Sequence, residues 1–216
     1  MTQFKIIEKY RADFSEQLSQ ALVQIELALT AQQQQTLLMY LDKLLLWNKA
    51  YNLTAITEPK EALIKHLFDC LSIVPFLNDG TLLDIGTGAG LPGVIIAICQ
   101  PERHCTVLDS NQKKIRFIKQ ISSELALKNI TPIASRIEHY EGQFDVVTSR
   151  AFASLTDFVT LASPKMQANG CLQAMKGHAP EVEERQQLSA TWNIDVVPLS
   201  VPQLPDTRHL VNLHLI

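Results

Sequence analysis

The stretch Thr81-Leu-Leu-Asp-Ile-Gly-Thr-Gly-Ala-Gly-Leu-Pro-Gly93 decides the fold of this 216-residue chain. A short apolar run ends at Asp84, and three glycines then follow at every second position. Glycine adopts positive φ without strain and lets a ligand approach the backbone closely. Pro92 stands where the first turn of a helix begins, and the amino end of a helix favours negatively charged or hydrogen-bonding ligand groups. The stretch therefore predicts a strand, a glycine loop and a helix that hold a nucleotide-type cofactor.

The glycine spacing separates the classes of cofactor. Dinucleotide-binding loops follow G-x-G-x-x-G, but here the third glycine position holds Leu91. No G-x-x-x-x-G-K-[ST] phosphate loop occurs in the chain. The spacing Asp84-x-Gly86-x-Gly88-x-Gly90 instead resembles motif I of S-adenosylmethionine-dependent methyltransferases, whose loop holds the methionine end of the cofactor. A dehydrogenase is the least supported alternative.

An acidic residue further along the chain supports this interpretation. Residues 104–108 predict a strand that ends at Asp109, nineteen residues after Gly90. An acid at the tip of the second strand accepts hydrogen bonds from both ribose hydroxyls of an adenosine. Such bonds to a charged acceptor contribute about 1.5–3 kcal/mol each. Taken alone, Asp109 also fits the start of the next helix, but together with the glycine loop it predicts ribose binding.

From residue 81 onward, strands alternate with helices, which predicts a mostly parallel sheet with helices on both faces. The expected strands are residues 81–85, 105–108, 131–134, 145–148, 171–175, 194–200 and 209–216. The expected helices are residues 92–99, 113–126, 155–166 and 181–189. Asn169-Gly170 predicts a turn before the fifth strand. The last two strands flank a turn with two prolines, which predicts an antiparallel hairpin at one edge.

The first eighty residues have helical periodicity instead. Leucines and isoleucines recur at helical spacing between residues 18 and 29, and Thr30 with Gln33 fits a capping box that opens a second helix. Pro59 begins a third helix and Pro75 ends it. We therefore expect an N-terminal helical segment over residues 1–78 and a methyltransferase domain over residues 79–216.

Composition favours a cytoplasmic enzyme. A hydrophobic content of 46% supports a sizeable core. There is no apolar run of eighteen residues, and Met1-Thr-Gln-Phe-Lys5 is unlike a signal peptide, so we expect no membrane association. The four cysteines have neither C-x-x-C nor metal-ligand spacing, which predicts reduced thiols and no metal site.

The charge distribution leaves two interpretations open. A net charge of −3 is unlike that of a general nucleic-acid binder. Residues 100–136 nevertheless hold seven Lys or Arg against three acids, and four of these bases, Lys113 and Arg116 among them, lie between residues 113 and 119. They form either the solvated face of a helix or a patch that contacts phosphates.

Further strings of the sequence resemble one family, the bacterial 16S rRNA guanine-N7 methyltransferases called RsmG or GidB. The matching strings are residues 83–93, Leu108-Asp-Ser110, Lys113-Lys-Ile-Arg-Phe117, Ser149-Arg-Ala-Phe-Ala-Ser154, Met175-Lys-Gly177, Trp47-Asn48, Asn52-Leu-Thr54 and His66-x-x-Asp69. The resemblance runs from about residue 40 to the carboxyl end. It implies a Rossmann-like α/β fold with a seven-stranded, mostly parallel sheet, an antiparallel edge hairpin and an N-terminal helical extension. It also implies S-adenosyl-L-methionine as cofactor and methylation of guanine 527 in 16S rRNA, with a 30S subunit or an assembly intermediate as the partner.

The resemblance implies cofactor contacts at Gly86, Leu91, Ile137, Glu138 and Arg150. The loop and the second strand add two further candidates, Gly88 and Asp109. The position after the third strand suits an apolar side chain that covers adenine, although a plain core residue also fits Ile137. For Arg150, cofactor carboxylate binding, RNA phosphate binding and a surface ion pair all remain open.

Candidate RNA contacts also come from the resemblance. Asn52, His66, Asp69 and Lys176 match family positions, and the basic helix adds Lys113 and Arg116. His66 and Asp69 share one face of a helix, so a hydrogen bond between them and a contact with substrate are both open.

The expected reaction needs no general base, because guanine N7 has a lone pair and no proton to remove. Holding the reactants in place can supply about 7–11 kcal/mol. An aromatic face would stabilise the cationic product, and Phe152 is either that face or a core residue. Two other classes of protein stay open, since a fold does not determine an acceptor: a small-molecule methyltransferase, and a protein that binds RNA without catalysis.

Overall fold

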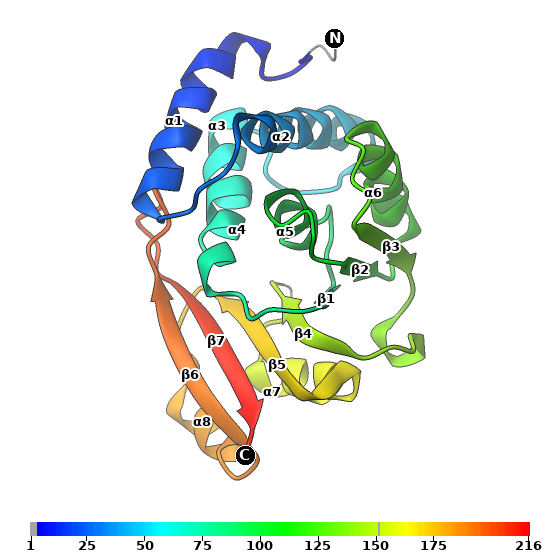
Figure 1. The fold of residues 1–216 in the computed structure, drawn as a ribbon, viewed down its shortest axis with the longest axis vertical. Helices are drawn as coiled ribbons and strands as arrows, with labels where there is room; N and C mark the ends of the chain where they lie inside the picture. Colours follow the sequence, from blue (N-terminus) through cyan, green and yellow to red (C-terminus); the bar gives the residue numbers. More distant parts are fainter. Residues whose placement is uncertain (1–3, 151) are drawn as a thin grey trace.

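The fold is a seven-stranded sheet of order β3-β2-β1-β4-β5-β7-β6, covered by helices (Figure 1). It is described by a computed structural model over residues 4–150 and 152–216. The strands β1 to β5 pair in parallel, and β7 runs antiparallel to both β5 and β6. The strands are β1 (Leu82–Ile85), β2 (Cys105–Asp109), β3 (Ile130–Ala134), β4 (Phe144–Ser149), β5 (Met166–Lys176), β6 (Trp192–Leu199) and β7 (Arg208–Leu215). The expected fold class and its edge hairpin are confirmed.

The N-terminal part is helical, as its periodicity predicts. After a short 3-10 turn, η1 (Glu8–Tyr10), come α1 (Arg11–Gln24) and α2 (Ala31–Tyr51). The capping box is confirmed, because the Gln33 amide donates to the Thr30 hydroxyl and the Gln33 side chain accepts from the Thr30 amide. The third helix is irregular: α3 (Pro59–Ala62) passes into a π-helical segment, η2 (Leu63–Phe68), and then into α4 (Asp69–Leu71), before the 3-10 turn η3 (Val74–Phe76). π-Helical turns occur frequently at functional sites.

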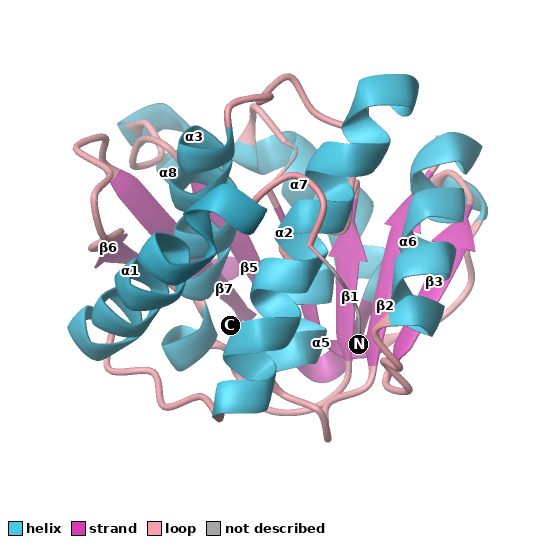
Figure 2. Cartoon of the chain, turned by 90° about the horizontal axis from the view of Figure 1, so that it is seen from above, coloured by secondary structure: helices cyan, strands magenta, loops and turns pink. Residues whose placement is uncertain are grey.

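The remaining helices lie on both faces of the sheet (Figure 2). They are α5 (Gly93–Cys99), α6 (Gln112–Glu124), α7 (Leu155–Ala162) and α8 (Val182–Leu188), with 3-10 turns η4 (Ile137–His139) and η5 (Ser163–Lys165). Alternate strand residues point to opposite faces, so Leu82 belongs to the buried cluster beneath α2, α5 and α6, whereas Leu83 belongs to the cluster beneath α7. The two layers leave the carboxyl edge of the parallel strands open for a site.

The sequence prediction is wrong around the fifth strand. The helix expected to reach residue 166 ends at Ala162, because Pro164 lies in the 3-10 turn that follows. Residues Asn169 and Gly170, expected to form a turn, lie inside β5 instead. The β4–β5 register shifts between Phe144 and Val146, opposite this segment. A Cβ on Gly170 would lie 2.7 Å from the Asp145 carbonyl oxygen, so the turn-like glycine serves a close approach of two strands.

Helix α2 is packed against the glycine stretch. The buried Tyr40 hydroxyl donates to the Ala89 carbonyl at 2.8 Å, and the Gln33 amide group donates to the Ile98 and Cys99 carbonyls at the end of α5. One buried cluster includes Tyr40 and Val94, which lie on opposite sides of the expected boundary at residue 78. The division into 1–78 and 79–216 stays a prediction.

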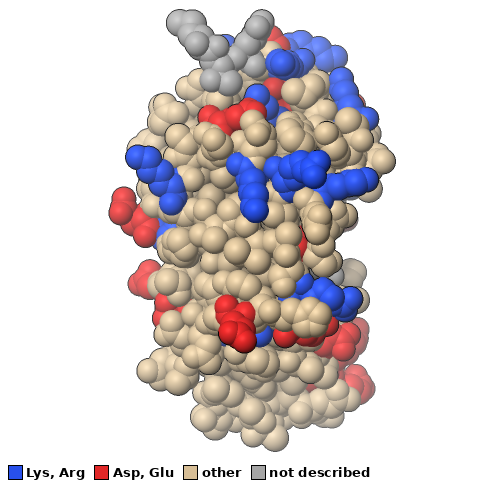
Figure 3. Space-filling model, turned by 90° about the vertical axis from the view of Figure 1, so that its right-hand side faces the viewer, with Lys and Arg blue, Asp and Glu red and all other residues tan. Residues whose placement is uncertain are grey.

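Basic side chains lie close together on the face of the molecule that carries α6 (Figure 3). Figure 3 shows the side that carries α6, where Lys and Arg side chains form a band. The exposed residues Lys113, Arg116 and Lys119 lie on this helix. No helix within residues 4–150 and 152–216 is long and apolar enough to cross a membrane. The four cysteines are free thiols and all are buried.

Candidate active site

The glycine loop has the backbone geometry that its sequence predicts. Gly86, Gly88 and Gly90 all have positive φ, at 67°, 61° and 100°. Gly93, the first residue of α5, is packed tightly: an added Cβ would overlap the Val107 side chain and lie 2.8 Å from Asp84 Oδ2. Gly93 thus allows the close approach of helix to strand that the third glycine provides in dinucleotide-binding loops.

Asp84 holds the loop from beneath. Its Oδ2 accepts hydrogen bonds from the Thr87 hydroxyl at 2.6 Å and from the Gly93 amide at 2.8 Å. The carboxyl group is fully buried, and this burial raises its pKa to about 7, although the two hydrogen bonds act in the opposite direction. Oδ1 has no hydrogen-bond partner among the described residues. Asp84 is therefore a structural group whose charge state changes near neutral pH.

Asp109 closes the loop from the second strand. Its Oδ2 accepts from the Gly88 amide at 2.9 Å and its Oδ1 accepts from the Asn111 amide at 2.8 Å. The Lys114 ammonium lies 3.9 Å from Oδ2. Each carboxylate oxygen has a second lone pair, so Asp109 can fix the loop and still accept hydrogen bonds from a ligand.

Two cavities meet at the loop. One has a volume of about 380 Å³ and is lined by Gly86, Asp109, Ile137 and Glu138 among others. The second has a volume of about 200 Å³ and is lined by Gly86, Gly88, Leu91 and Arg150 among others. Gly86 belongs to both. The structure therefore brings all seven sequence-predicted cofactor residues to one continuous edge of the sheet.

The donor set of these cavities fits S-adenosylmethionine. The larger of the two combines a carboxylate at the tip of β2 with the apolar Ile137, which suits a ribose and an adenine. The smaller combines the loop backbone with the Arg150 guanidinium, which suits the amino-acid end. A Cβ on Gly88 would meet only the Lys114 ammonium, at 4.0 Å, so the loop leaves open space above itself.

A third cavity, of about 590 Å³, lies next to the smaller cofactor cavity. His66 and Arg150 line both. Its walls come from η2, from the segment after β4, from the end of β5 with the residues that follow, and from the start of β7. Because β7 is antiparallel to β5, its first residue reaches the edge where the parallel strands end: His209 pairs with Lys176. We call this space the substrate cavity, after the ligand that we propose it binds.

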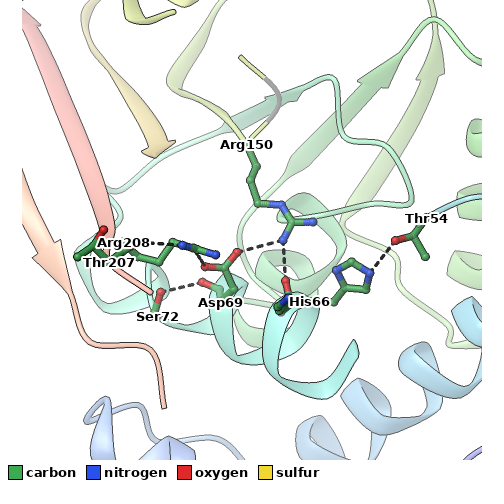
Figure 4. A network of polar contacts seen from close by, with 8 residues as sticks. Thr54, His66, Asp69, Ser72, Arg150, Thr207 and Arg208 are labelled. Carbon is green, nitrogen blue, oxygen red and sulfur yellow. Dashed lines mark hydrogen bonds and ion pairs between the residues drawn. The ribbon is translucent and has the colours of Figure 1, made fainter. Parts of the chain in front are cut away.

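Asp69 joins two arginines in the wall of the substrate cavity (Figure 4). Its Oδ2 lies 3.1 Å from Arg150 Nη1 and its Oδ1 lies 3.1 Å from Arg208 Nε. Arg150 Nη1 also donates to the Lys65 carbonyl at 3.0 Å. The Asp69 side chain is 6% exposed, so two charges of the opposite sign compensate the burial of one carboxylate.

His66 is a neutral, buried residue of this network. Its Nε2 lies 2.9 Å from the Thr54 hydroxyl, and the Asn48 side chain fixes residue 54 through hydrogen bonds to its amide and carbonyl. Burial, and after it the Arg150 charge, lower the pKa of His66 to about 4. Nδ1 has no partner among the described residues. The hydrogen bond between His66 and Asp69 that the sequence left open is absent from the contacts described.

The segment after β4 is fixed by Lys176. Its ammonium donates to the carbonyls of Phe152 and Ala153, and burial lowers its pKa. Phe152 is half-buried, lines the substrate cavity and packs against Phe158 with ring centroids 5.5 Å apart. Ala151, within the Ser149-Arg-Ala-Phe-Ala-Ser154 string, lies outside the described residues.

The candidate RNA contacts divide into two groups. His66, Asp69 and Lys176 line the substrate cavity, whereas Asn52 is an exposed C-cap of α2, and Lys113 and Arg116 are exposed on α6. Neither Lys65 nor Arg208 was among the candidates, although both line the cavity. The predicted antiparallel hairpin was a usable signal for Arg208, because it brings the start of the last strand to the cofactor edge.

Comparison with known proteins places the chain in a family. Residues 33–211 match the family model described as GidB, rRNA small subunit methyltransferase G. The protein named ribosomal RNA small subunit methyltransferase G is 67% identical in Psychrobacter arcticus over 91% of this chain and 82% of that relative. The protein of the same name in Acinetobacter baumannii is 51% identical over 94% of this chain and 99% of that relative.

Solved structures show the same fold at low identity. A SAM-dependent methyltransferase from Aquifex aeolicus superposes with a TM-score of 0.54 at 16% identity, over 72% of this chain and 93% of that one. The ribosomal protein L11 methylase of Lactobacillus delbrueckii gives a TM-score of 0.53 at 13% identity, over 72% and 79% of the two chains. With the family model spanning most of the sequence, this chain belongs to the rRNA small subunit methyltransferase G family.

Proposed function

We propose that this protein transfers the methyl group of S-adenosyl-L-methionine to N7 of guanine 527 in bacterial 16S rRNA. Family membership supports the reaction and the cofactor. The observation that carries the proposal is the junction of cavities: His66 and Arg150 line both the cofactor cavity at the glycine loop and the 590 Å³ substrate cavity. A base in the substrate cavity therefore lies beside the methionine end of the cofactor.

Each cofactor residue has a role that its position supports. S-adenosylmethionine, when bound, supplies an electrophilic methyl group. Asp109 accepts hydrogen bonds from the ribose hydroxyls, and Ile137 covers one adenine face while the backbone at Glu138 reads its edge. Gly86, Gly88 and Leu91 shape the space around the methionine end. Arg150, held on one side by Asp69, binds the carboxylate of the cofactor.

The chain positions the reactants and does not abstract a proton. Guanine N7 has a lone pair and carries no hydrogen, so the neutral His66 need not act as a base. Positioning can supply about 7–11 kcal/mol of the barrier. Phe152, at the cavity wall, offers its ring to the guanine, which becomes cationic on methylation.

The lining of the substrate cavity favours RNA over a small apolar metabolite. It includes Lys65, Arg150, Lys176 and Arg208, and these outnumber the acids Asp69, Glu181 and Glu184. Ile56, Phe152 and Met175 make part of the wall apolar, as in pockets for small molecules, so the preference for RNA rests on the seven charged side chains of the lining. Basic side chains in the wall of a cavity of about 590 Å³ suit a nucleotide that has left its stack.

We infer further that the acceptor is a 30S subunit or an assembly intermediate, and that the protein acts in the cytoplasm. A net charge of −3 is unsuited to gripping any polyanion and supports recognition of a folded RNA shape.

The decisive experiment offers methyl-labelled S-adenosylmethionine with three acceptors: deproteinised 16S rRNA, 30S particles and a metabolite extract. The ribosomal material comes from cells that lack the modification. We expect label in 16S rRNA, with a chain break at guanine 527 after reduction and aniline treatment. Stronger labelling of 30S particles than of free rRNA would support the particle as substrate. Label only in metabolites would contradict the RNA acceptor, and cofactor binding without transfer would favour a protein that only binds RNA.

The ribose assignment has a separate test. Asp109→Ala removes the acceptor of the Gly88 amide together with the predicted ribose contacts, so we expect cofactor affinity to fall at least about tenfold. Isothermal calorimetry measures this directly, with Asp145→Ala at the opposite edge of the sheet as the control carboxylate. Wild-type affinity in Asp109→Ala would refute the assignment.

A further inference from the structure

The four cations of the substrate cavity differ in how much hydrogen-bonding capacity they have left. The Lys65 ammonium pairs with Glu61 at 2.7 Å, and the Lys176 ammonium donates to two backbone carbonyls. Arg150 lies at the junction with the cofactor cavity. Arg208 lines the substrate cavity and does not line either cofactor cavity. Of the two arginines, Arg208 is therefore the one placed away from the cofactor loop.

The Arg208 guanidinium is held in a fixed orientation. Nε donates to Asp69 Oδ1 at 3.1 Å, and Nη1 donates to the Thr207 carbonyl at 2.7 Å. Among the described residues, Nη2 has no hydrogen-bond partner. The side chain is 22% exposed. Much of its conformational entropy is thus already lost in the fold, and the Nη2 donor remains available to a ligand.

Charge in this wall is unbalanced. Asp69 is shared by Arg150 and Arg208, so the group of three carries one net positive charge. A shared carboxylate orients both guanidinium groups without neutralising both of them. The excess suits an anion near the outer part of the cavity.

We propose that Arg208 binds a backbone phosphate of the substrate RNA beside the target guanosine, and that Asp69 is the residue that positions it. This inference rests on the proposed function and deepens it. The base lies at the His66 and Arg150 junction, and the phosphate lies at the Arg208 side of the same cavity. The cavity volume of about 590 Å³ accommodates a single extruded nucleotide.

The test compares steady-state kinetics of Arg208→Ala with those of wild type on 30S particles. We expect KM for the RNA substrate to rise at least about tenfold, because a charge-assisted phosphate contact is lost. KM for S-adenosylmethionine stays unchanged, since Arg150 and Asp69 remain paired. The slope of log affinity against log salt, from filter binding, falls by about one unit. Arg185→Ala, an exposed arginine on α8 outside the substrate cavity, is the matched control and leaves all three quantities unchanged.

Two results would overturn the proposal. An unchanged RNA KM and salt slope would show that Arg208 does not contact the backbone. An equal rise in the cofactor KM would show that Arg208 acts only by holding Asp69 against Arg150.

Arg208→Gln keeps a hydrogen-bond donor toward Asp69 but loses the charge, so it decides the question if the alanine variant is unstable in a thermal melt. It is expected to show the same increase in RNA KM and the same loss of slope, and wild-type values in this variant would also overturn the proposal. Because wild type is active in each of these results, they are distinct from failure of the proposed function, in which wild type labels no rRNA.

Discussion

The cofactor cavities and the substrate cavity lie side by side but are built differently. The cofactor side depends on a loop backbone and on residues at successive strand ends, with Gly86 and Asp109 at its centre. The substrate side depends on charged side chains from separate segments of the chain, and Asp69 joins two of them, Arg150 and Arg208. Each side also buries a titratable group whose pKa is shifted, Asp84 beneath the loop and His66 in the cavity wall. The difference shows that one edge of a sheet can carry one cavity shaped by the backbone and another lined by charged side chains.

The two buried groups should respond to pH in opposite ways. The pKa of His66 is near 6.5 in the unfolded chain and about 4 when folded, so the stability due to its neutral ring is complete above pH 6.5 and is lost as pH falls toward 4. The pKa of Asp84 is 3.8 unfolded and about 7 folded, so its contribution is complete below pH 3.8 and is lost as pH rises through 7. The two contributions therefore oppose each other between about pH 4 and 6.5.

Replacing one group should reveal the other. In His66→Gln we expect the free energy of unfolding to fall as pH rises from 4 to 7, and the gap to wild type to change by about 3 kcal/mol across that window. Asp84→Asn should show the opposite slope. Urea midpoints measured at half-unit pH steps provide the comparison. Curves parallel to wild type in both variants would show that neither group is shifted as described.

Arg150, like His66, lines both the cofactor side and the substrate side. We expect Arg150→Ala to lower kcat/KM about 100-fold, because a charged contact at the reacting centre is lost. The fold should persist, since Asp69 retains Arg208. Methylation assays with varied cofactor and varied RNA, together with a thermal melt, check this. Normal methylation would show that Arg150 is not part of the site.

Glycine substitutions should separate backbone shape from side-chain charge. Gly93→Ala places a Cβ against Val107 and Asp84, so we expect a loss of about 1–3 kcal/mol in stability and weaker cofactor binding. Gly177→Ala, in the wall of the substrate cavity, is the control, because its Cβ would meet only Arg208 Nη1, at 3.9 Å. Chemical denaturation and cofactor titration of both variants test the contrast. Equal effects would mean that the loop has no special packing requirement.

The smallest expected effect concerns the hydrogen bond between α2 and the glycine loop. Tyr40→Phe removes the hydrogen bond to the Ala89 carbonyl and leaves the packing intact, so about 1 kcal/mol of stability should be lost. Cofactor affinity should fall by a few fold, with RNA affinity unchanged at saturating cofactor. Tyr51→Phe, an exposed tyrosine at the end of the same helix, is the matched control. A loss of RNA affinity with unchanged cofactor affinity would show that α2 supports the substrate cavity and not the cofactor cavities.

The two sides also differ in how far sequence predicts them. The loop, Asp109 and Ile137 could be placed because each follows a strand of a recognisable alternating pattern, and strand ends meet at one edge. Asp69 and Arg208 are 139 residues apart, and their contact exists only because β7 returns antiparallel along β5. The predicted hairpin indicates where the last strand starts, but no local pattern predicts that Arg208 contacts Asp69.

Local signals were also overridden by packing. Asn169-Gly170 has the composition of a turn, yet it lies inside β5, between the β4-paired residues Met166 and Cys171, where Gly170 closely approaches Asp145. The helix after Pro59 has ordinary helical periodicity, and nothing in that pattern predicts the π-helical segment that carries Lys65 and His66. Tertiary contacts decide such details, whereas propensity decides the element.

All four cysteines are buried, so their reaction with a thiol reagent can report local opening of the fold. Burial raises the pKa of the Cys70 and Cys105 thiols to about 12, so neither reacts readily while the fold is closed. Cys70 adjoins Asp69, and Cys105 begins the strand that ends at Asp109. The rate at which a thiol reagent modifies each cysteine therefore measures how often its own region opens. A cofactor bound at the glycine loop should slow modification of Cys105. An RNA bound in the substrate cavity should slow modification of Cys70.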